Sequence, residues 1–318
     1  MSPLLKLVIK RLALGLLTLL GVSLVIFAGT EILPGDVAEA ILGQTATPEA
    51  LASIRHDLEL DRSAGVRYLN WLAGLFHGDL GMSLSGRQDI ASLIGARLGN
   101  TLFLASTAAL ISVPLAVILG VVAVRYQNTW LDRFFSVSTL GTISLPEFFI
   151  GYLLVTVFAV HLGWLGALST VYEGMGIVDR FKAIMLPAIT LTLGVLAHML
   201  RMTRAAILNV MTSSYIETAE LKGLRRSEII FRHALPNALS PILNVIVINL
   251  AYLVVGVVVV EVIFVYPGMG QLMVDHVAKR DVPVIQACGM IFASTYVGLN
   301  LLADILAMVS NPRLRHPR

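Results

Sequence analysis

The sequence predicts an all-α integral membrane protein with about six transmembrane helices. Its composition is the first reason: 57% of the 318 residues are apolar, 14% are charged, and the mean hydropathy is +0.83. Soluble domains carry about 25% charged residues. A charged fraction of 14% is too small to cover the surface of a water-soluble globule of this length. The second reason is a set of apolar segments long enough to cross a hydrocarbon layer about 30 Å thick, which takes about 20 helical residues.

Six apolar segments are candidates, at residues 12–33, 102–124, 134–160, 186–200, 242–264 and 284–309, and all but the fourth reach this length. The first follows Lys6, Lys10 and Arg11, as the apolar part of a signal peptide would. Its apolar run exceeds the usual 7–15 residues, however, and no cleavage site is evident, so an uncleaved helix is favoured. The fourth segment is the shortest. The fifth contains VVGVVVV, which favours a strand in water, but an open strand in lipid leaves backbone groups unpaired.

Basic residues mark one side of the predicted bundle. They precede the first segment, separate the second from the third and the fourth from the fifth, and follow the sixth: Lys6, Lys10, Arg11, Arg125, Arg133, Arg201, Arg204, Lys222, Arg225, Arg226, Arg232, Arg313, Arg315 and Arg318. The short opposite loops hold Arg180, Lys182, Lys279 and Arg280. Lysine and arginine favour the cytoplasmic side, so both termini are predicted to be cytoplasmic. Because the charges lie between apolar spans, the net charge of +3 does not indicate nucleic-acid binding.

The long segment from residue 34 to about residue 97 is predicted to be external. Within it, ASIRHDLELDRSAGVRYLNWLAGLF places apolar residues at helical spacing, including Leu58, Tyr68, Leu72 and Phe76, which predicts short helices. Two interpretations are open for these helices. They could form a docking surface for an external partner, or a lid that packs on the membrane bundle.

Several kinds of catalytic site have no counterpart in the sequence. There is no G-x-x-x-x-G-K-[ST] phosphate-binding loop, no H-E-x-x-H and no G-x-S-x-G, and the seven histidines are dispersed. The single cysteine, Cys288, excludes an internal disulfide and a cysteine-based metal cluster, and we expect it to be a small buried residue. No catalytic residue, no metal site and no cofactor bound by this chain is predicted. A transport or scaffold role is favoured.

The most polar long stretch of the chain is the predicted cytoplasmic loop at residues 215–241, YIETAELKGLRRSEIIFRHALPNALSP. We expect a helix from Tyr215 to Lys222 that ends at Gly223, since glycine commonly supplies the left-handed residue after a helix. A second short helix should run to Leu235, with Ser227 as its N-cap or with its start within 224–227. Pro236 should then prevent clean continuation into the fifth span.

Ile229, Ile230 and Phe231 give the second loop helix an apolar face. An exposed apolar patch on a cytoplasmic helix suggests a pocket on a partner protein. An amphipathic loop that lies on lipid headgroups, attracted by Arg225, Arg226 and Arg232, is the alternative.

The loop resembles a known motif. Glu217-Thr218-Ala219, three further residues, Gly223 and then Leu235-Pro236 resemble the E-A-A-x3-G-x9-I-x-L-P loop of permease subunits of binding-protein-dependent ABC importers. Thr218 replaces the middle alanine of the motif, and His233 stands where isoleucine is usual. Other blocks agree along nearly the whole chain, namely LPGD at 33–36, GDLGMS at 78–83, SLPEFFIG at 144–151, VEVIFVYPGMG at 260–270, RDVPVIQA at 280–287 and NPRLR at 311–315. Together they resemble the peptide/nickel class of these permeases.

The resemblance implies a type I importer permease fold in the inner membrane. Residues 1–96 would form the first helix and a long periplasmic segment, residues 97–309 the five-helix core, and residues 310–318 a cytoplasmic tail. In that family the loop is a coupling helix seated in a cleft of an ATPase subunit. Carried over, this implies ATPase coupling through Glu217, Ala219, Gly223, Arg225, Arg226, Ile229, Ile230, Leu235 and Pro236.

The implied partners are a second homologous permease, two cytoplasmic ATPase subunits that bind ATP and Mg, and an external substrate-binding protein. Membrane lipid is the remaining partner. The cargo would be a small solute, most commonly a di- or oligopeptide, with nickel and some sugars as further members of the class.

Two carboxylates within predicted spans are candidates for a translocation path. Glu147 lies in the third span beside Pro146, and a charge at a helix centre costs about 2.5–3.5 kcal/mol on insertion scales. It should therefore face the bundle interior or water, or bond to backbone groups that Pro146 leaves free. Glu261 could line the path or be an interfacial carboxylate satisfied by the following turn.

Other polar residues within the spans are expected to have structural roles. His198 is expected to be a satisfied interfacial residue. Interhelical hydrogen bonds are expected from Asn244, Asn249, Asn300 and Asp304, and Asp304 is also a candidate partner for a nearby arginine.

The last external connection, YPGMGQLMVDHVAKRDVP at 266–283, should form a tight turn at Pro267, Gly268 and Gly270. One or two helical turns are predicted after it, over residues 271–279. In the resembled family this region faces the binding protein. A plain helical connector is the alternative.

Three functions are compatible with the whole chain. The favoured one is an ATP-powered importer permease. An ion-gradient-driven secondary transporter is the alternative, although such proteins tend to show internal repeats and none is obvious here. A membrane scaffold without a transport role would leave the loop at 215–241 without a function.

Overall fold

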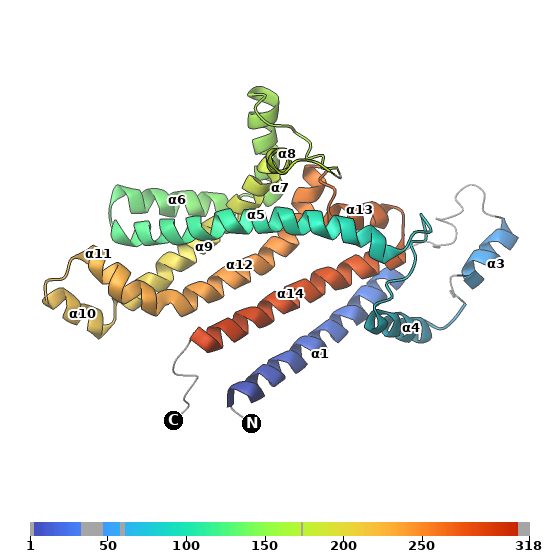
Figure 1. Cartoon of the computed structure of the whole chain (residues 1–318), viewed down its shortest axis with the longest axis horizontal. Helices are drawn as coiled ribbons and strands as arrows, with labels where there is room; N and C mark the ends of the chain where they lie inside the picture. The colour runs from blue at the N-terminus through green and yellow to red at the C-terminus, as the bar shows by residue number, and fades with distance from the viewer. Residues whose placement is uncertain (1–2, 33–46, 58–60, 173, 311–318) are drawn as a thin grey trace. The chain divides into compact units, whose positions relative to one another are not determined.

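Helices account for nearly all the regular secondary structure of the protein. A computed structural model describes residues 3–32, 47–57, 61–172 and 174–310, and in these ranges the non-helical pairing is one isolated β-bridge between Met82 and Asp89. The helices belong to two compact units. The first comprises Met1–Ala13, Phe103–Tyr266 and Gly298–Arg318, and the second Leu14–Leu102 and Pro267–Val297. Figure 1 shows the course of the chain through these elements.

Five helices of the described residues are long and apolar enough to cross a membrane. They involve α1 (Pro3–Ile32), α5 (Ile90–Arg125), α9 (Met185–Met211), α12 (Leu235–Ile263) with the helical residues before it, and α14 (Val282–Ser310). Each contains most or all of one predicted span, and α1, α5 and α9 extend well beyond it. The all-α membrane architecture predicted from composition and span length is therefore confirmed.

The prediction that the third span is a single continuous helix is wrong. It consists of α6 (Trp130–Ser144), α7 (Glu147–Leu154) and a π-helical continuation, η2 (Val155–His161), and the two halves meet at a bend of 102°. Leu145 and Pro146 both have extended backbone angles at the break. A proline disfavours helical geometry in the residue before it, which explains why the helix stops at Ser144.

In the first unit, α9 packs most extensively against α12 and also against α6 and α7. The guanidinium group of Arg204 on α9 donates to both carboxylate oxygens of Asp132 on α6, each at 2.9 Å. Asp132 also accepts the backbone N–H of Asn128 at 3.1 Å, so one buried carboxylate fixes both the α5–α6 turn and α9. Arg11 and Asp304 form an ion pair at 2.8 Å, as predicted for Asp304.

The external segment contributes two helices to the second unit, α3 (Pro48–Asp57) and α4 (Ala64–His77), as the helical spacing predicted. Tyr68 and Trp71 of α4 pack against Phe27 of α1, and the Tyr68 hydroxyl lies 2.9 Å from Ser23 Oγ. Arg67 pairs with Glu31 of α1. These contacts favour a segment packed on its own unit, although α4 has no fully buried residue.

The core of the second unit joins α5, α13 (Met269–Ala278) and α14. Ile90 and Ile94 pack there with Met269, Leu272 and the N-terminal turns of α14, where Cys288 is buried. The helix predicted at 271–279 and the buried cysteine are both confirmed. Asn100 Nδ2 donates to the Pro267 carbonyl at 2.8 Å, and Thr101 Oγ1 accepts the Met269 N–H at 2.8 Å, so α5 holds the turn before α13.

Asp281, the residue immediately before α14, is fully buried and holds a distant loop. Its carboxylate accepts hydrogen bonds from Ser83 Oγ (2.6 Å), Leu84 N (3.0 Å), Ser85 N (3.0 Å) and Ser85 Oγ (2.8 Å). Burial by itself raises the pKa of this carboxyl group, but these hydrogen bonds outweigh that effect and hold the pKa below its ordinary value. The loop at 83–85 is thereby tied to the α13–α14 junction.

Candidate functional site

Two features of the first unit are candidates for function. The first is the helical loop between α9 and α12, which contains α10 (Ser214–Leu221), α11 (Arg226–Glu228) and the π-helical η3 (Ile229–Ala234). The second is a cavity among α6, α7, α9 and α12, with a volume of about 420 Å³. The predicted site residues divide between these two places.

Gly223 ends α10 in the left-handed conformation that was predicted, with φ = +77°. Its N–H donates to the Glu220 carbonyl at 2.8 Å, and the N–H of Leu224 donates to the Ala219 carbonyl at 3.3 Å. These bonds satisfy carbonyl groups that the helix end would leave free. Most residues with a side chain are strained at this φ, so the turn favours glycine.

The second loop helix begins earlier than a Ser227 cap would place it, and Pro236 does not interrupt it. Arg225 is the N-cap without a side-chain bond, and helical hydrogen bonding continues from Arg226 through α12. The wider π-helical turns of η3 end at Ala234, two residues before Pro236. The proline ring and its missing N–H disturb the α-helical hydrogen bonding of the preceding turn. The ribbon changes direction there without a break (Figure 1).

The prediction of an exposed apolar face on this helix is partly wrong. Ile229 and Ile230 are 1% and 0% exposed, because they pack into a core with Val121 and Val124 of α5 and Ile207 of α9. Ile216 and Ala219 of α10 join the same core. The loop is therefore a folded part of the first unit, held by buried side chains on both of its helices.

Other apolar side chains of the loop do face outward. Leu221 is 83% exposed, Phe231 54% and Tyr215 45%. We refer to these three exposed residues together as the exposed loop face, whether or not they adjoin one another. Glu217, Arg225 and Pro236 are also exposed, whereas Leu235 is half-buried. The predicted coupling residues thus fall into an outward group and a buried group that holds the loop in place.

Arg226 fixes the loop to the end of α5. Its guanidinium group donates to the Val124 carbonyl at 3.1 Å and to Gln127 Oε1 at 2.6 Å. The guanidinium group thus forms part of the loop's attachment to α5.

The cavity of the first unit is lined mainly by apolar side chains, including Ile143, Ile150, Val195 and Val259. Its polar lining consists of Thr142, Glu147, His198, Asn249 and Tyr252. The volume lies within the range of about 300–1,000 Å³ that is typical of small-molecule sites. A small solute could therefore be accommodated there.

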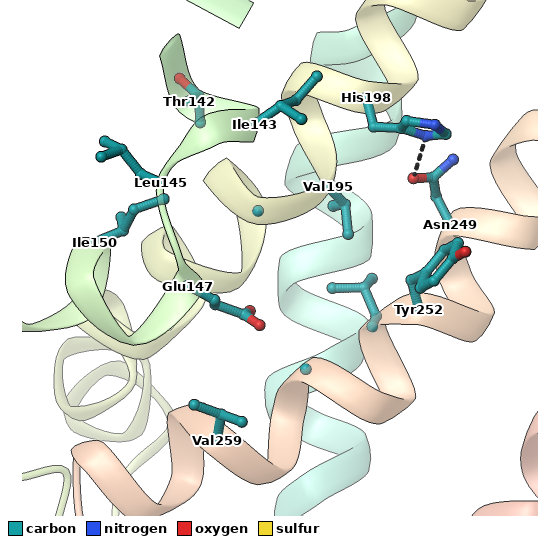
Figure 2. A pocket seen from close by; sticks show the side chains of 13 residues that line it. Thr142, Ile143, Leu145, Glu147, Ile150, Val195, His198, Asn249, Tyr252 and Val259 are labelled. Atoms are coloured by element: carbon teal, nitrogen blue, oxygen red, sulfur yellow. Dashed lines mark hydrogen bonds between the residues drawn. The ribbon is translucent and has the colours of Figure 1, made fainter. Parts of the chain in front are cut away.

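Glu147 is the carboxylate of this cavity, and it comes from the first turn of α7. Figure 2 shows its side chain pointing from α7 toward α12. A Cβ atom added at Gly256 would lie 2.8 and 2.9 Å from the two carboxylate oxygens, and one added at Gly194 would lie 3.4 Å from Oε1. The missing side chains of these two glycines provide the space that the carboxylate occupies.

His198 and Asn249 join α9 and α12 at the same cavity (Figure 2). Asn249 Nδ2 donates to the Val245 carbonyl at 2.8 Å, which turns its Oδ1 toward His198 Nδ1 at 3.2 Å. Because an amide oxygen can only accept, the proton must be on Nδ1. The interhelical bond predicted for Asn249 is confirmed. Glu261, the second predicted path residue, is fully buried and does not line this cavity.

Sequence reasoning missed the exposed position of Leu221 and the glycine space around Glu147. Helical geometry contained a signal for Leu221, because it stands five residues after the buried Ile216 and so points to another face of α10. No pattern along the chain pairs Gly194 and Gly256 with Glu147, because the three residues come from α9, α12 and α7.

Comparisons with known proteins agree with the whole-chain resemblance. The family model of the binding-protein-dependent transport system inner membrane component matches residues 89–316, and the model of its N-terminal part matches residues 4–105. The glutathione transport system permease protein GsiC of Escherichia coli O6:H1 (strain CFT073) is 36% identical over 310 residues, which cover 97% of this chain and 98% of that protein. The same protein of Escherichia coli K12 and of Salmonella typhimurium LT2 is 35% and 34% identical over 310 residues, with the same coverage.

A solved structure resembles the fold as well. A chain of the MetNI methionine ABC transporter in an inward-facing conformation superposes with a TM-score of 0.55 at 18% identity. The match covers 69% of this chain and 96% of that one. At this identity the likeness concerns the fold alone.

Proposed function

The chain belongs to the family of binding-protein-dependent transport system inner membrane components, as a permease subunit of an ABC importer, and we propose that it carries small peptides. Its fold is the all-α type I importer permease fold that the sequence predicted. It is a multi-pass protein of the inner membrane. The family match supports this function over the alternative, a transporter that an ion gradient drives without an ATPase.

The energy for transport, in this proposal, enters through the loop between α9 and α12. Two cytoplasmic ATPase subunits bind ATP and Mg, a second homologous permease completes the path, and an external binding protein delivers the cargo. Both termini and the loop lie on the cytoplasmic side. The exposed loop face, formed by Tyr215, Leu221 and Phe231, sits in a cleft of one ATPase subunit, beside the exposed residues Glu217 and Arg225.

The observation that carries this proposal is the way the loop is built. Its buried side chains belong to the same core as α5 and α9, and its second helix continues into α12 without a break. Shifting a two-state equilibrium from 1:99 to 99:1 takes about 5.5 kcal/mol of differential interaction. A flexible loop would lose that energy in its own conformational freedom, whereas a folded loop continuous with a spanning helix can transmit it.

The peptide cargo follows from the relatives and from the cavity. The relatives named above are glutathione transport permeases, and glutathione is a tripeptide. Within the described residues no group of three histidine, cysteine, aspartate or glutamate side chains could hold a metal ion. The cavity therefore suits an organic solute better than a bare metal ion.

Substitution of the exposed loop face tests the coupling role. Vesicles would contain this permease, its partner permease, both ATPase subunits and the binding protein, and glutathione would be the transported probe. We expect Leu221→Glu and Phe231→Glu to remove most ATP-driven uptake, because each places a charge in an apolar contact. Leu221→Met, which keeps the side chain apolar, should retain uptake close to that of the unmodified protein.

The amount of assembled complex is the second measurement. Neither Leu221 nor Phe231 is buried, so both glutamate variants should reach the membrane in normal amounts but should recover less ATPase subunit on purification. Normal uptake together with normal ATPase recovery in both variants would exclude this face as the coupling contact.

A further inference from the structure

Glu147 has three features that neither the proposed coupling role of the loop nor the packing of the unit explains. Among the residues that the structure describes, it is the one acidic side chain that lines the 420 Å³ cavity, and no lysine or arginine of that set lines it. Among the described residues, none donates a hydrogen bond or forms an ion pair with its carboxylate. It therefore does not bond to the backbone groups near Pro146, which is one of the two roles that the sequence suggests for it.

The position of this carboxylate is nevertheless well defined. The spaces at Gly194 and Gly256 admit its two oxygens between α9 and α12, and a methyl group at Gly256 would crowd both of them, whereas one at Gly194 would touch Oε1 at 3.4 Å. Both helices thus lack a side chain at the points where the carboxylate needs room. A charge within a membrane-spanning unit is costly and faces a cavity or a partner, and here it faces the cavity (Figure 2).

The chemistry of the surroundings narrows the kind of ligand. A divalent metal ion takes several oxygen or nitrogen ligands, and the described residues offer no group of three acidic, histidine or cysteine side chains. A primary ammonium group carries one positive charge and needs few acceptors. The apolar walls formed by Ile143, Ile150, Val195 and Val259 would suit the uncharged remainder of a small organic solute.

We propose that Glu147, held between Gly194 and Gly256, is the recognition point in this cavity for a protonated amino group of the cargo. This assignment rests on the proposed function, since it gives that peptide cargo a point of contact within the permease. The carboxylate pairs with the ammonium group while the cargo is in the cavity. Its charge balances the ammonium charge and lowers the cost of that group in a membrane-spanning unit.

The site can be tested without any knowledge of the cargo. Val259 lines the cavity on α12, so Val259→Cys in a Cys288→Ala background places a single thiol there. The assembled transporter would be treated with a cationic trimethylammonium-ethyl methanethiosulfonate and with its anionic sulfonatoethyl counterpart. We expect the ratio of cationic to anionic labelling rates to fall roughly tenfold when Glu147→Gln is added, and to be kept by Glu147→Asp.

A thiol away from the cavity provides the control. Leu168 is 60% exposed in the connection between η2 and α8, and Leu168→Cys should show the same labelling ratio with and without Glu147→Gln. If Glu147→Gln leaves the ratio at Val259→Cys unchanged, the carboxylate does not attract cations and the proposal is overturned.

Uptake separates this inference from the proposed function. Complete vesicles would be offered glutathione and N-acetylglutathione, which lacks the ammonium group. We expect Glu147→Gln to reduce the preference for glutathione several-fold. Any preference of the binding protein itself cancels, because the unmodified permease and the Glu147→Gln variant are assayed with the same binding protein. ATP-driven uptake with an unchanged preference would contradict the role of Glu147 alone. Absence of ATP-driven uptake of glutathione and of other small peptides by the unmodified protein would contradict the cargo proposed above, and the labelling ratio would still decide the charge of the site.

Discussion

At the scale of single residues, Asp281 shows how one buried carboxylate fixes a segment from a distant part of the sequence. A buried charge is costly unless it is paired or hydrogen-bonded, and Asp281 is satisfied by four donors from Ser83, Leu84 and Ser85. Two of these donors are backbone N–H groups, so the carboxylate sets the path of the chain as well as the side-chain positions.

Asp281→Asn should destabilise the second unit by about 2–4 kcal/mol, because an amide NH2 cannot accept the bonds that one carboxylate oxygen now accepts. The change can be measured as a lower melting temperature in detergent and as faster tryptic cleavage after Arg87, which is exposed beside the loop. Asp179→Asn removes an exposed carboxylate paired with Lys182 and should change stability by less than about 0.5 kcal/mol. Equal stability of the two variants would contradict this role of Asp281.

The same carboxylate gives the protein a defined response to acid. Because its pKa is lowered on folding, its contribution is fully present above the unfolded-state pKa of about 3.9 and is lost as the pH falls through the lower folded-state pKa. Between neutral pH and about pH 5, Asp281 should therefore contribute no change in stability. The difference in melting temperature between the unmodified protein and Asp281→Asn should narrow only in more acidic solution.

At the scale of elements, the loop between α9 and α12 contains two helices, α10 and α11, that end in different ways. Gly223 gives α10 a sharp stop in a left-handed turn, whereas α11 passes through η3 into α12 without an end. The loop therefore turns sharply where α10 stops, and it must move with α12 where the helix continues. This asymmetry suits an element that passes a displacement to one spanning helix.

Gly223→Pro should abolish ATP-driven uptake while the protein stays in the membrane. Proline cannot adopt φ = +77° and has no N–H to donate to the Glu220 carbonyl, so α10 would be displaced from its place beside α11. Gly223→Asn is the matched control, because asparagine tolerates the left-handed conformation, and it should keep most of the uptake. Uptake by the proline variant at the normal rate would argue against a rigid coupling loop.

At the scale of the whole molecule, the distribution of basic residues predicts which ends of the spanning helices face the cytoplasm. The prediction rests on lysine and arginine placement alone. It places the exposed loop face inside the cell, where ATP is available to partner subunits, and α4 outside.

Single cysteines test this orientation. In a Cys288→Ala background, Leu221→Cys should react with a membrane-impermeant maleimide only in inside-out vesicles, because Leu221 is 83% exposed on the proposed cytoplasmic loop. Phe76→Cys, at a site on α4 that is 67% exposed, should react only in right-side-out vesicles. The reverse pattern would place the termini and the loop outside.

Much of the protein follows from the sequence by itself. The apolar spans, the membrane class and the left-handed turn at Gly223 could be predicted because each depends on properties local to a short stretch, namely apolar length and the backbone angles that a residue tolerates. The ordered motifs along nearly the whole chain similarly predicted the family.

Only the tertiary structure decided the remaining points. The sequence predicted one continuous third span, whereas the structure divides it at a bend of 102°, after which α7 packs against α9 and α12. The sequence predicts Ile229 and Ile230 as part of a contact face, but residues of α5 and α9 cover them in the folded chain. The surroundings of Glu147 between two glycines, and the four hydrogen bonds to Asp281, also could not be predicted from the sequence. Burial and the pairing of a charge depend on segments that are distant in sequence and meet only in the folded chain.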